Sequence, residues 1–300
     1  MQTFELYLAG RFIQTNDVLQ VNDKYTQVPF AKTFLAGPKE FESAIQQAED
    51  SKSALANWPI FERFSTLNQI AERIQHSREE LATLLSRESA KPMMYALAEI
   101  NRAAQTFSAA ATACRNLPGE IIRLDWTPNG KGRTGYVQSF PIGVVAGISP
   151  FNFPMNLAVH KLAPALAAGC PIILKPASST PLSTLALAKI LDQSGVPKGA
   201  ISILPSTRET GMALVTDDRI KLLSFTGSPE VGWYLKEKSG KKKTVLELGG
   251  NAGVIISKSA QLEEIISKCI VGAFSYSGQV CIHAQRFFVH RDHYLSLIHI

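Results

Sequence analysis

Cysteine is scarce in this chain, and its four copies do not form a familiar cluster. They stand at positions 114, 170, 269 and 281 of the 300 residues. These gaps match neither a zinc site nor a disulfide framework. We therefore expect free thiols, a reducing compartment and no metal centre.

Long apolar runs and targeting signals are also missing. The most apolar stretch, residues 143–174, is interrupted by Asn152, Pro154, His160, Lys161 and Pro164. These interruptions argue against an ordinary transmembrane helix. The first residues, MQTFE, carry an acid where a secretory signal would carry a basic region. We expect a soluble, cytoplasmic protein without a membrane partner.

The sequence also lacks a concentrated basic surface. The 31 basic and 25 acidic residues leave a formal net charge of +6, and the positive charges are scattered. One run, KKK at 241–243, is typical of a solvated loop. Because no arginine-rich stripe alternates with aromatic residues, we expect no nucleic-acid partner. The hydrophobic fraction of 45% fits a globular chain with more than one domain.

The first 117 residues predict strands and packing helices in which we see no chemistry. Strands are expected at 4–12 and 18–21. Phe41, Ile45 and Ala48 recur at helical spacing after Gly37. Three helices are predicted: one up to Pro59, one with inward residues between 64 and 84, and an Ala-rich one from Lys91-Pro92 to about 117.

A hairpin is expected at 123–141, which contains PNGKG at 128–132. Asn-Gly between extended segments is a strong turn signal. Gly130 and Gly132 also invite a phosphate-loop interpretation, but no Gly-Lys-Ser/Thr follows.

From Ile142 onward, short apolar runs alternate with helical segments. Strands are predicted at 143–148, 172–174, 200–204 and 221–225, and helices at 157–168, 182–194 and 210–216. This alternation predicts an α/β fold with a parallel sheet covered by helices. The strand ends of such sheets bind nucleotides.

One cysteine stands in a chemically suggestive context. Cys281 ends the string FSYSGQVC at 274–281, and Glu247 lies in VLELGGN at 245–251, 34 residues earlier (281 − 247). A cysteine paired with an acid suggests a nucleophile with its own base. The alternative is a buried structural cysteine, which we expect for Cys114, Cys170 and Cys269.

Three further motifs follow apolar strands: SPFNFP at 149–154, ILKPAS at 173–178 and SFTGSPEVG at 224–232. Asn152, in the first, is either a turn cap or a donor to a developing negative charge. In the third, Pro229 predicts the first turn of a helix, whose free N–H groups would suit a pyrophosphate. Ser228 alone would also be an ordinary N-cap. No Gly-x-Gly-x-x-Gly fingerprint is present.

Together these motifs make the chain resemble the NAD(P)-dependent aldehyde dehydrogenase superfamily, to about Arg291. The resemblance implies a Rossmann-like cofactor domain at 1–251, with the hairpin 123–141 as an oligomerisation arm. Residues 252–300 would begin a second α/β catalytic domain that is truncated here, with 295–300 as a non-native tail. The full-length protein would be a homodimer or homotetramer.

The resemblance also assigns roles in the oxidation of a small aldehyde to its carboxylic acid. Cys281 would be the nucleophile that forms a thiohemiacetal and then a thioester. The Asn152 amide and the Cys281 N–H would stabilise the oxyanion. Glu247 would activate water, which argues against the CoA-acylating branch and a thiol hydrolase. Lys161 would support a proton network, or else be a snorkelling surface lysine.

The cofactor would be NADP or NAD. NAD-preferring members commonly have glutamate where this chain has Ser178, and serine removes a charge that would repel the 2′-phosphate. Lys175 could then pair with that phosphate, so NADP is slightly favoured. The implied cofactor contacts are Ser149, Pro150, Phe151, Lys175, Ala177, Ser178, Thr226, Gly227, Ser228, Val231 and Leu248.

The aldehyde tunnel is implied to be lined by Leu157, His160, Val280 and Ile282. Family members that handle large apolar aldehydes often have an aromatic residue where His160 stands. Its polarity favours a short hydroxy- or oxo-substituted aldehyde such as lactaldehyde, glyceraldehyde or succinate semialdehyde. A merely hydrogen-bonded histidine is the alternative. For the chain as a whole, the alternative to an active dehydrogenase is an inactive binding fragment.

Overall fold

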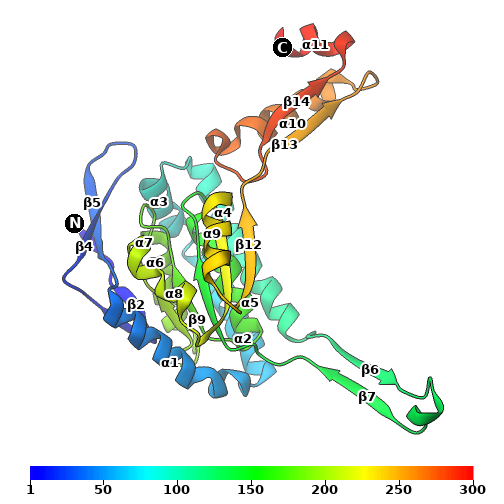
Figure 1. Ribbon diagram of the computed structural model, residues 1–300. Helices are drawn as coiled ribbons and strands as arrows, with labels where there is room; N and C mark the ends of the chain where they lie inside the picture. Colours follow the sequence, from blue (N-terminus) through cyan, green and yellow to red (C-terminus); the bar gives the residue numbers. More distant parts are fainter. Residues whose placement is uncertain (300) are drawn as a thin grey trace.

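A seven-stranded sheet forms the centre of the computed structural model, which describes residues 1–299 (Figure 1). The strand order is β12-β11-β8-β9-β10-β2-β3. The first five strands run parallel, and β2 and β3 are antiparallel. Their bounds are β2 Leu6–Leu8, β3 Arg11–Ile13, β8 Val144–Ile148, β9 Ile172–Lys175, β10 Ile201–Ile203, β11 Ile220–Gly227 and β12 Lys243–Leu248. The predicted parallel α/β fold is confirmed.

Helices cover both faces of this sheet. One layer contains α2 Ile60–His76, α3 Arg78–Ser89, α4 Met93–Cys114, α5 Pro154–Ala167 and α6 Leu182–Asp192. The other contains α1 Pro38–Ala56, α7 Arg208–Gly211, α8 Ala213–Thr216 and α9 Pro229–Lys238. Alternate strand residues supply each core: Val145 and Ile172 pack in the first, and Val144 and Ile173 in the second. Two buried faces explain why these strands are continuous apolar runs.

Several predicted elements are divided in the structure. The strand expected at 4–12 is a hairpin of β2 and β3, because Ala9 and Gly10 take φ values of 52° and 90° and reverse the chain. The helix expected across 64–84 breaks at Ser77 into α2 and α3. The segment at 210–216 forms the two short helices α7 and α8. A small sheet of β1 Gln2–Thr3, β5 Pro29–Phe34 and β4 Val18–Asn22 flanks the core, and the sequence did not predict β5.

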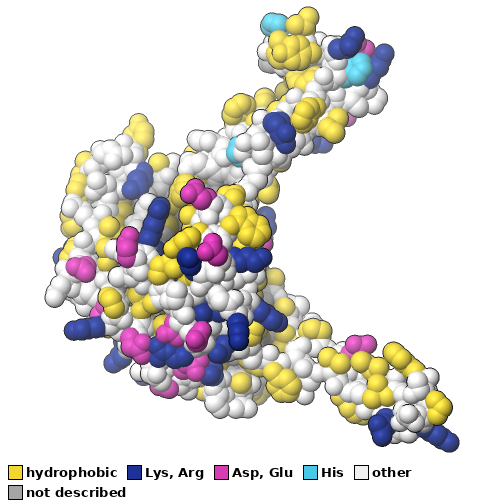
Figure 2. All heavy atoms as spheres, in the orientation of Figure 1, with side chains coloured by type: hydrophobic (Ala, Val, Ile, Leu, Met, Phe, Trp, Pro, Cys, Tyr) yellow, Lys and Arg dark blue, Asp and Glu magenta, His cyan; other side chains and the backbone are white. Residues whose placement is uncertain are grey.

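The expected hairpin projects from the body as β6 Gly119–Arg123 and β7 Thr134–Gln138 (Figure 1). It begins before residue 123, and the 3₁₀ turn Pro128–Gly130 lies at its tip. The arm exposes Ile121, Trp126 and Tyr136. Figure 2 shows hydrophobic side chains gathered on the arm. Exposed apolar side chains on this scale are typical of an interaction surface.

After β12 the chain leaves the sheet and forms a smaller unit (Figure 1). Strands β13 Ala252–Ile256 and β14 Ala284–Val289 pair in parallel. The unit also contains α10 Leu262–Phe274, the 3₁₀ turn Ser275–Gly278 and α11 Arg291–His299; Ile300, the end of the predicted tail, lies outside the described residues. Within residues 1–299, no helix combines the length and apolarity needed to span a bilayer.

Candidate active site

Most of the predicted site residues lie where parallel strands of the central sheet end. Ser149–Phe153 follows β8. Lys175 is the last residue of β9, and Ala177 and Ser178 follow it. Thr226 and Gly227 end β11 directly before Ser228. Strand register places Ile148 beside Lys175, and Thr226 beside Glu247 near the end of β12. Since parallel strands end at one edge of a sheet, residues distant in sequence meet at that edge.

The Asn152 loop contacts the Cys281 loop directly. The Asn152 Nδ2 donates a hydrogen bond of 2.8 Å to the Gln279 carbonyl oxygen, across 127 residues of sequence. The Asn152 Oδ1 is buried and has no protein partner in the described structure. A side-chain carbon at Gly250 would lie 3.8 Å from the Cys281 carbonyl oxygen. The fold therefore brings the segments after β8 and β12 to the cysteine loop.

Cys281 differs from the other cysteines in its exposure. All four lie within residues 1–299 and are free thiols. Cys281 is exposed, Cys114 and Cys170 are buried, and Cys269 is partly buried. A nucleophile must be accessible to its substrate, so the exposure of Cys281 fits the role expected for it, as the burial of Cys114 and Cys170 fits theirs, whereas Cys269 is less buried than expected.

The turn before Cys281 is strained. Tyr276 and Ser277 have φ values of 49° and 54°, and Gly278 follows at 74°. Left-handed conformations of non-glycine residues cost about 1–3 kcal/mol each and persist when the surroundings enforce them. The Tyr276 side chain supplies contacts that enforce this one: it is buried, and its ring meets the Phe153 ring edge-on at 5.9 Å.

Lys161 lies beneath the sheet edge and not at the surface, so the snorkelling alternative is wrong. The residue is 4% exposed. Its Nζ donates to the Thr226 Oγ1 at 2.8 Å and to the Ser224 Oγ at 3.2 Å. Burial lowers the pKa of Lys161 to about 8, against the opposing effect of the Glu247 charge. A side-chain carbon at Gly147 would lie 3.2 Å from the Lys161 stem, so a residue without a side chain suits that position.

His160 occupies the neighbouring, exposed position on α5. Burial lowers its pKa, the Lys161 and Arg102 charges act in the same direction, and Glu247 opposes them. The three charged side chains therefore lie within electrostatic reach of the imidazole. Of the other expected tunnel residues, Leu157 and Val280 are partly buried and Ile282 is exposed.

The cofactor-side residues form a second group along the same edge. Lys175 is partly buried, and burial lowers its pKa; the charge of Arg208 acts in the same direction and Glu209 opposes it. The exposed Ser178 donates its hydroxyl to the Ser206 carbonyl oxygen at 3.1 Å. Arg208 was not predicted; it adds a second cation close to Lys175.

The helix expected after Thr226 is α9. Ser228 is its N-cap and accepts a hydrogen bond from the Val231 N–H at 3.5 Å. The N-cap interpretation is thus correct, and the neighbouring N–H groups at this helix end can still face an anion. A side-chain carbon at Gly232 would lie 2.4 Å from the Leu248 side chain, so α9 packs closely on β12.

The remaining expected cofactor contacts differ in burial. Ser149 is buried, and its hydroxyl has no protein partner within residues 1–299. An orphaned buried hydroxyl at the end of β8 fits a ligand with polar groups. Phe151 is exposed, whereas the others are partly buried: Pro150, Ala177, Thr226, Gly227, Val231 and Leu248.

Sequence reasoning missed a buried charge network beside the site. Lys91, expected only to interrupt two helices, pairs with Glu99 of α4, and its Nζ donates to the Asn152 carbonyl oxygen at 2.6 Å. The available signal was a lone carboxylate on an apolar helix face, since Glu99 lies between Ala96, Ile100 and Ala103 in the core.

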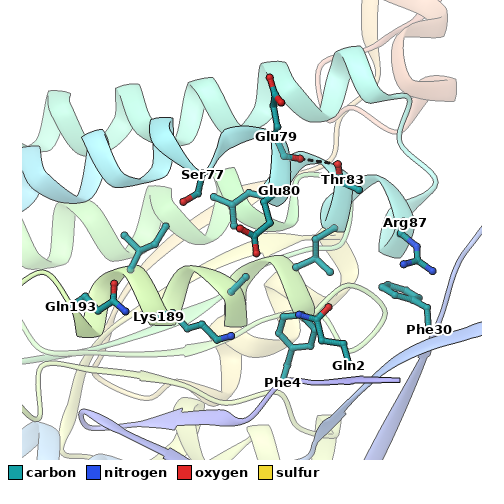
Figure 3. Close-up of a pocket in the computed structure, with 14 residues that line it drawn as sticks. Gln2, Phe4, Phe30, Ser77, Glu79, Glu80, Thr83, Arg87, Lys189 and Gln193 are labelled. Atoms are coloured by element: carbon teal, nitrogen blue, oxygen red, sulfur yellow. Dashed lines mark hydrogen bonds between the residues drawn. The ribbon is translucent and has the colours of Figure 1, made fainter.

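One hollow in the described structure contains none of these residues. Figure 3 shows this groove of about 520 Å³ between α3, α6 and the N-terminal strands, with Phe4, Phe30, Arg87 and Lys189 on its walls. It lacks a nucleophile and a buried unpaired polar group. We assign it no role.

Fold and site geometry define a parallel α/β protein of the type that binds dinucleotides at its strand ends. Among residues 1–299, no group of three acidic, histidine or cysteine side chains is arranged to hold a metal ion. The model of the aldehyde dehydrogenase family matches residues 12–299. The chain belongs to that family.

Three similar proteins illustrate this membership. The 3-sulfolactaldehyde dehydrogenase of Priestia megaterium is 36% identical over 99% of this chain and 62% of its own length. Aldehyde dehydrogenase 21 from Physcomitrella patens, solved in complex with the reaction product succinate, is 42% identical, with a TM-score of 0.96 over 99% of this chain and 63% of its own. The NADP-dependent glyceraldehyde-3-phosphate dehydrogenase from Bacillus halodurans C-125, solved with NADP, is 31% identical, with a TM-score of 0.96 over 100% of this chain and 64% of its own. The chain thus spans less than two thirds of the length of these relatives.

Proposed function

We propose that this chain carries the cofactor-binding and nucleophile-bearing parts of an NAD(P)-dependent aldehyde dehydrogenase that oxidises a small aldehyde to a carboxylic acid. The observation that supports this best is the 2.8 Å hydrogen bond from the Asn152 amide to the Gln279 carbonyl oxygen, two residues before Cys281. This bond supports the proposal because it joins the expected oxyanion donor to the loop that carries the exposed thiol.

In the proposed acylation, the Cys281 thiolate attacks the aldehyde carbon and a C–S bond forms. The oxygen becomes an alkoxide, which the second N–H of the Asn152 amide can stabilise. One such donor contributes about 3–4 kcal/mol to transition-state stability. A nicotinamide cofactor held at the sheet edge by Lys175 and the N-terminus of α9 would supply the hydride acceptor that takes this adduct to a thioester.

In the proposed deacylation, Glu247 takes a proton from water as the water attacks the thioester carbon. The C–S bond breaks, the carboxylic acid leaves and the thiolate returns. The Glu247 charge acts on the buried Lys161 ammonium, which donates to Thr226, the register neighbour of Glu247. A general base in this position contributes about 10²–10⁴-fold. The presence of Glu247 argues against a CoA-acylating enzyme or a thiol hydrolase.

The residues at the sheet edge suit a dinucleotide. Ser149 presents an unpartnered hydroxyl, α9 presents its N-terminus, and Lys175 would contact the adenosine ribose. Because Ser178 carries no charge and Arg208 adds a cation, we propose that NADP is accepted at least as well as NAD. The remaining predicted contacts would line the same edge.

For the substrate, we propose a short aldehyde with an anionic group at its far end. Arg102 lies close enough for its charge to act on His160, and two of the similar proteins are named with sulfolactaldehyde and succinate. A cation near the expected tunnel would favour such a tail.

We further propose that residues 1–251 form the cofactor domain and that the unit from 252 onward belongs to the catalytic domain. Oligomerisation as a dimer or tetramer would use the β6–β7 arm, whose apolar side chains are exposed. The free thiols support a cytoplasmic location.

The test is an assay of the purified chain with NAD or NADP and paired aldehydes. Succinate semialdehyde should produce reduced cofactor faster than butanal, and Arg102→Ala should reduce that preference. Mass spectrometry should find the acyl adduct on Cys281. Absence of both reduced cofactor and adduct, with correctly folded protein, would contradict the proposal.

A further inference from the structure

The Lys91 ammonium lies between the two loops that carry the expected reacting groups. Lys91 is 1% exposed and lies in the connection from α3 to α4. Its Nζ donates to the Asn152 carbonyl oxygen at 2.6 Å. The same Nζ lies 4.0 Å from the Phe153 ring centroid and 4.3 Å from that of Tyr276. One cation therefore contacts the loop after β8 and the loop before Cys281.

Glu99 holds this cation and also anchors the Asn152 loop. Its Oε2 pairs with Lys91. Its Oε1 accepts hydrogen bonds from the backbone N–H groups of Met155 at 3.0 Å and Asn156 at 3.1 Å. These N–H groups belong to the first turn of α5, where a carboxylate is favoured by the helix dipole. The carboxylate thus fixes the start of α5, two residues after Asn152.

Tyr276 joins the network from the cysteine side. It is one of the two left-handed residues in the strained turn, and its hydroxyl donates to the Ser89 carbonyl oxygen at 3.5 Å. Its ring lies over the Lys91 ammonium, an attraction that strengthens when the cation is desolvated. Together with the edge-on contact to the Phe153 ring, these contacts hold the turn against the body.

We propose that Lys91 is a positioning residue that couples the Asn152 amide to the Cys281 loop, through Glu99 on one side and Tyr276 on the other. The inference rests on the proposed function, because the coupling matters where amide and thiol act on one carbonyl. A misplacement of about 1 Å between such groups can lower a rate by about a hundredfold.

A purely structural ion pair would behave differently. Removing one partner of a buried pair destabilises a protein because the other charge is left unpaired, and neutralising both can restore stability. A structural role therefore predicts that a double variant recovers its stability and, with it, the burst of reduced cofactor. The positioning role predicts that Lys91→Met/Glu99→Gln regains stability but not the geometry, since no cation bridges the two loops.

Arg63 offers a matched control. It is also a buried cation, at 4% exposure. Its guanidinium donates to the carbonyl oxygens of Leu55 at 3.0 Å, Trp58 at 2.9 Å and Ala167 at 3.0 Å. None of these belongs to either loop. Arg63→Met should therefore lower the unfolding midpoint without a selective effect on the site.

The experiment compares wild type, Lys91→Met, the double variant, Tyr276→Leu and Arg63→Met. The first readout is amide hydrogen exchange of segments 149–153 and 275–281. Exchange should rise about tenfold or more in both segments for Lys91→Met and the double variant, and in 275–281 for Tyr276→Leu. In Arg63→Met, the exchange of these two segments should change no more than the exchange of the rest of the chain.

The second readout is the burst of reduced cofactor with succinate semialdehyde. Its rate should fall about ten- to a hundredfold in the two Lys91 variants while the Kd for NADP changes less than about threefold. Unchanged exchange in both segments, or full recovery of the burst in the double variant, would overturn the inference. If wild type gives no burst, the proposed function fails, and hydrogen exchange still decides the role of Lys91.

Discussion

Replacing Lys161 by methionine tests the buried ammonium at the sheet edge. Lys161 is 4% exposed, and burial lowers its pKa from 10.5 to about 8. At about 1.4 kcal/mol for each pKa unit, this gap corresponds to about 3 kcal/mol between the charged and neutral forms. Methionine has a similar length and no charge, so Lys161→Met should remove the titration with little change in packing.

The direction in which stability changes with pH follows from the depressed pKa of Lys161. The folded protein releases the Lys161 proton near pH 8, whereas the unfolded chain holds it to about 10.5. The stability contributed by neutral Lys161 is therefore present above 10.5 and is lost as the pH falls through about 8. Between about pH 8 and about pH 9.5, wild type should gain about 2 kcal/mol relative to Lys161→Met.

The assay is urea unfolding at a series of pH values from about 7 to about 9.5. All other lysines are the same in both proteins, so the difference between their free energies of unfolding isolates the contribution of Lys161. Lys189→Met, which removes an exposed lysine on α6, is the control and should follow wild type. Parallel curves for wild type and Lys161→Met would refute the reasoning, because Lys161 would then titrate as it does in the unfolded chain.

Three further predictions concern the proposed chemistry. Cys281→Ser should abolish dehydrogenase turnover while NADP binding persists in a fluorescence titration; normal turnover would exclude Cys281 as the nucleophile. Glu247→Gln should still give a burst of reduced cofactor, with steady-state turnover lower by about 10²–10⁴-fold; loss of both the burst and cofactor binding would make Glu247 structural. Ser178→Glu should weaken NADP far more than NAD, by a few kcal/mol (on the order expected for like charges in a partly buried site); an unchanged ratio of kcat/KM for the two cofactors would mean that Ser178 does not face the ribose.

Elements with a strong local pattern were predicted well from the sequence. The alternation after Ile142 correctly predicted four of the five parallel strands, because strands buried on both faces must be continuously apolar. Breaks within elements were missed. Ser77 separates α2 from α3 without a proline, and the reversal at Ala9 and Gly10 requires positive φ values at two residues, of which one is not glycine.

The residues of the candidate site also fall into two groups: those that a local motif marks and those whose position depends on distant contacts. Cys281, Asn152 and Ser228 stand in motifs that specify a local conformation, so a sequence interpretation could single them out. Lys161 was left between a buried and a surface position, because helical periodicity gives the face of a residue but not what covers that face. Its burial is decided by Thr226 and Ser224 on a strand more than 60 residues away.

The sequence by itself determined the class of fold, most of the strands and helices after Ile142, and the residue types able to do the chemistry. These follow from hydrophobic periodicity and from motifs, which are local properties. Only the tertiary structure decided which of those residues meet. The Lys91–Glu99 pair, the bond from Asn152 to the cysteine loop and the strained turn at Tyr276 depend on contacts between distant segments. Such contacts are set by packing the whole chain at once, because burial of a charge is tolerated only where its partners arrive from elsewhere in the fold.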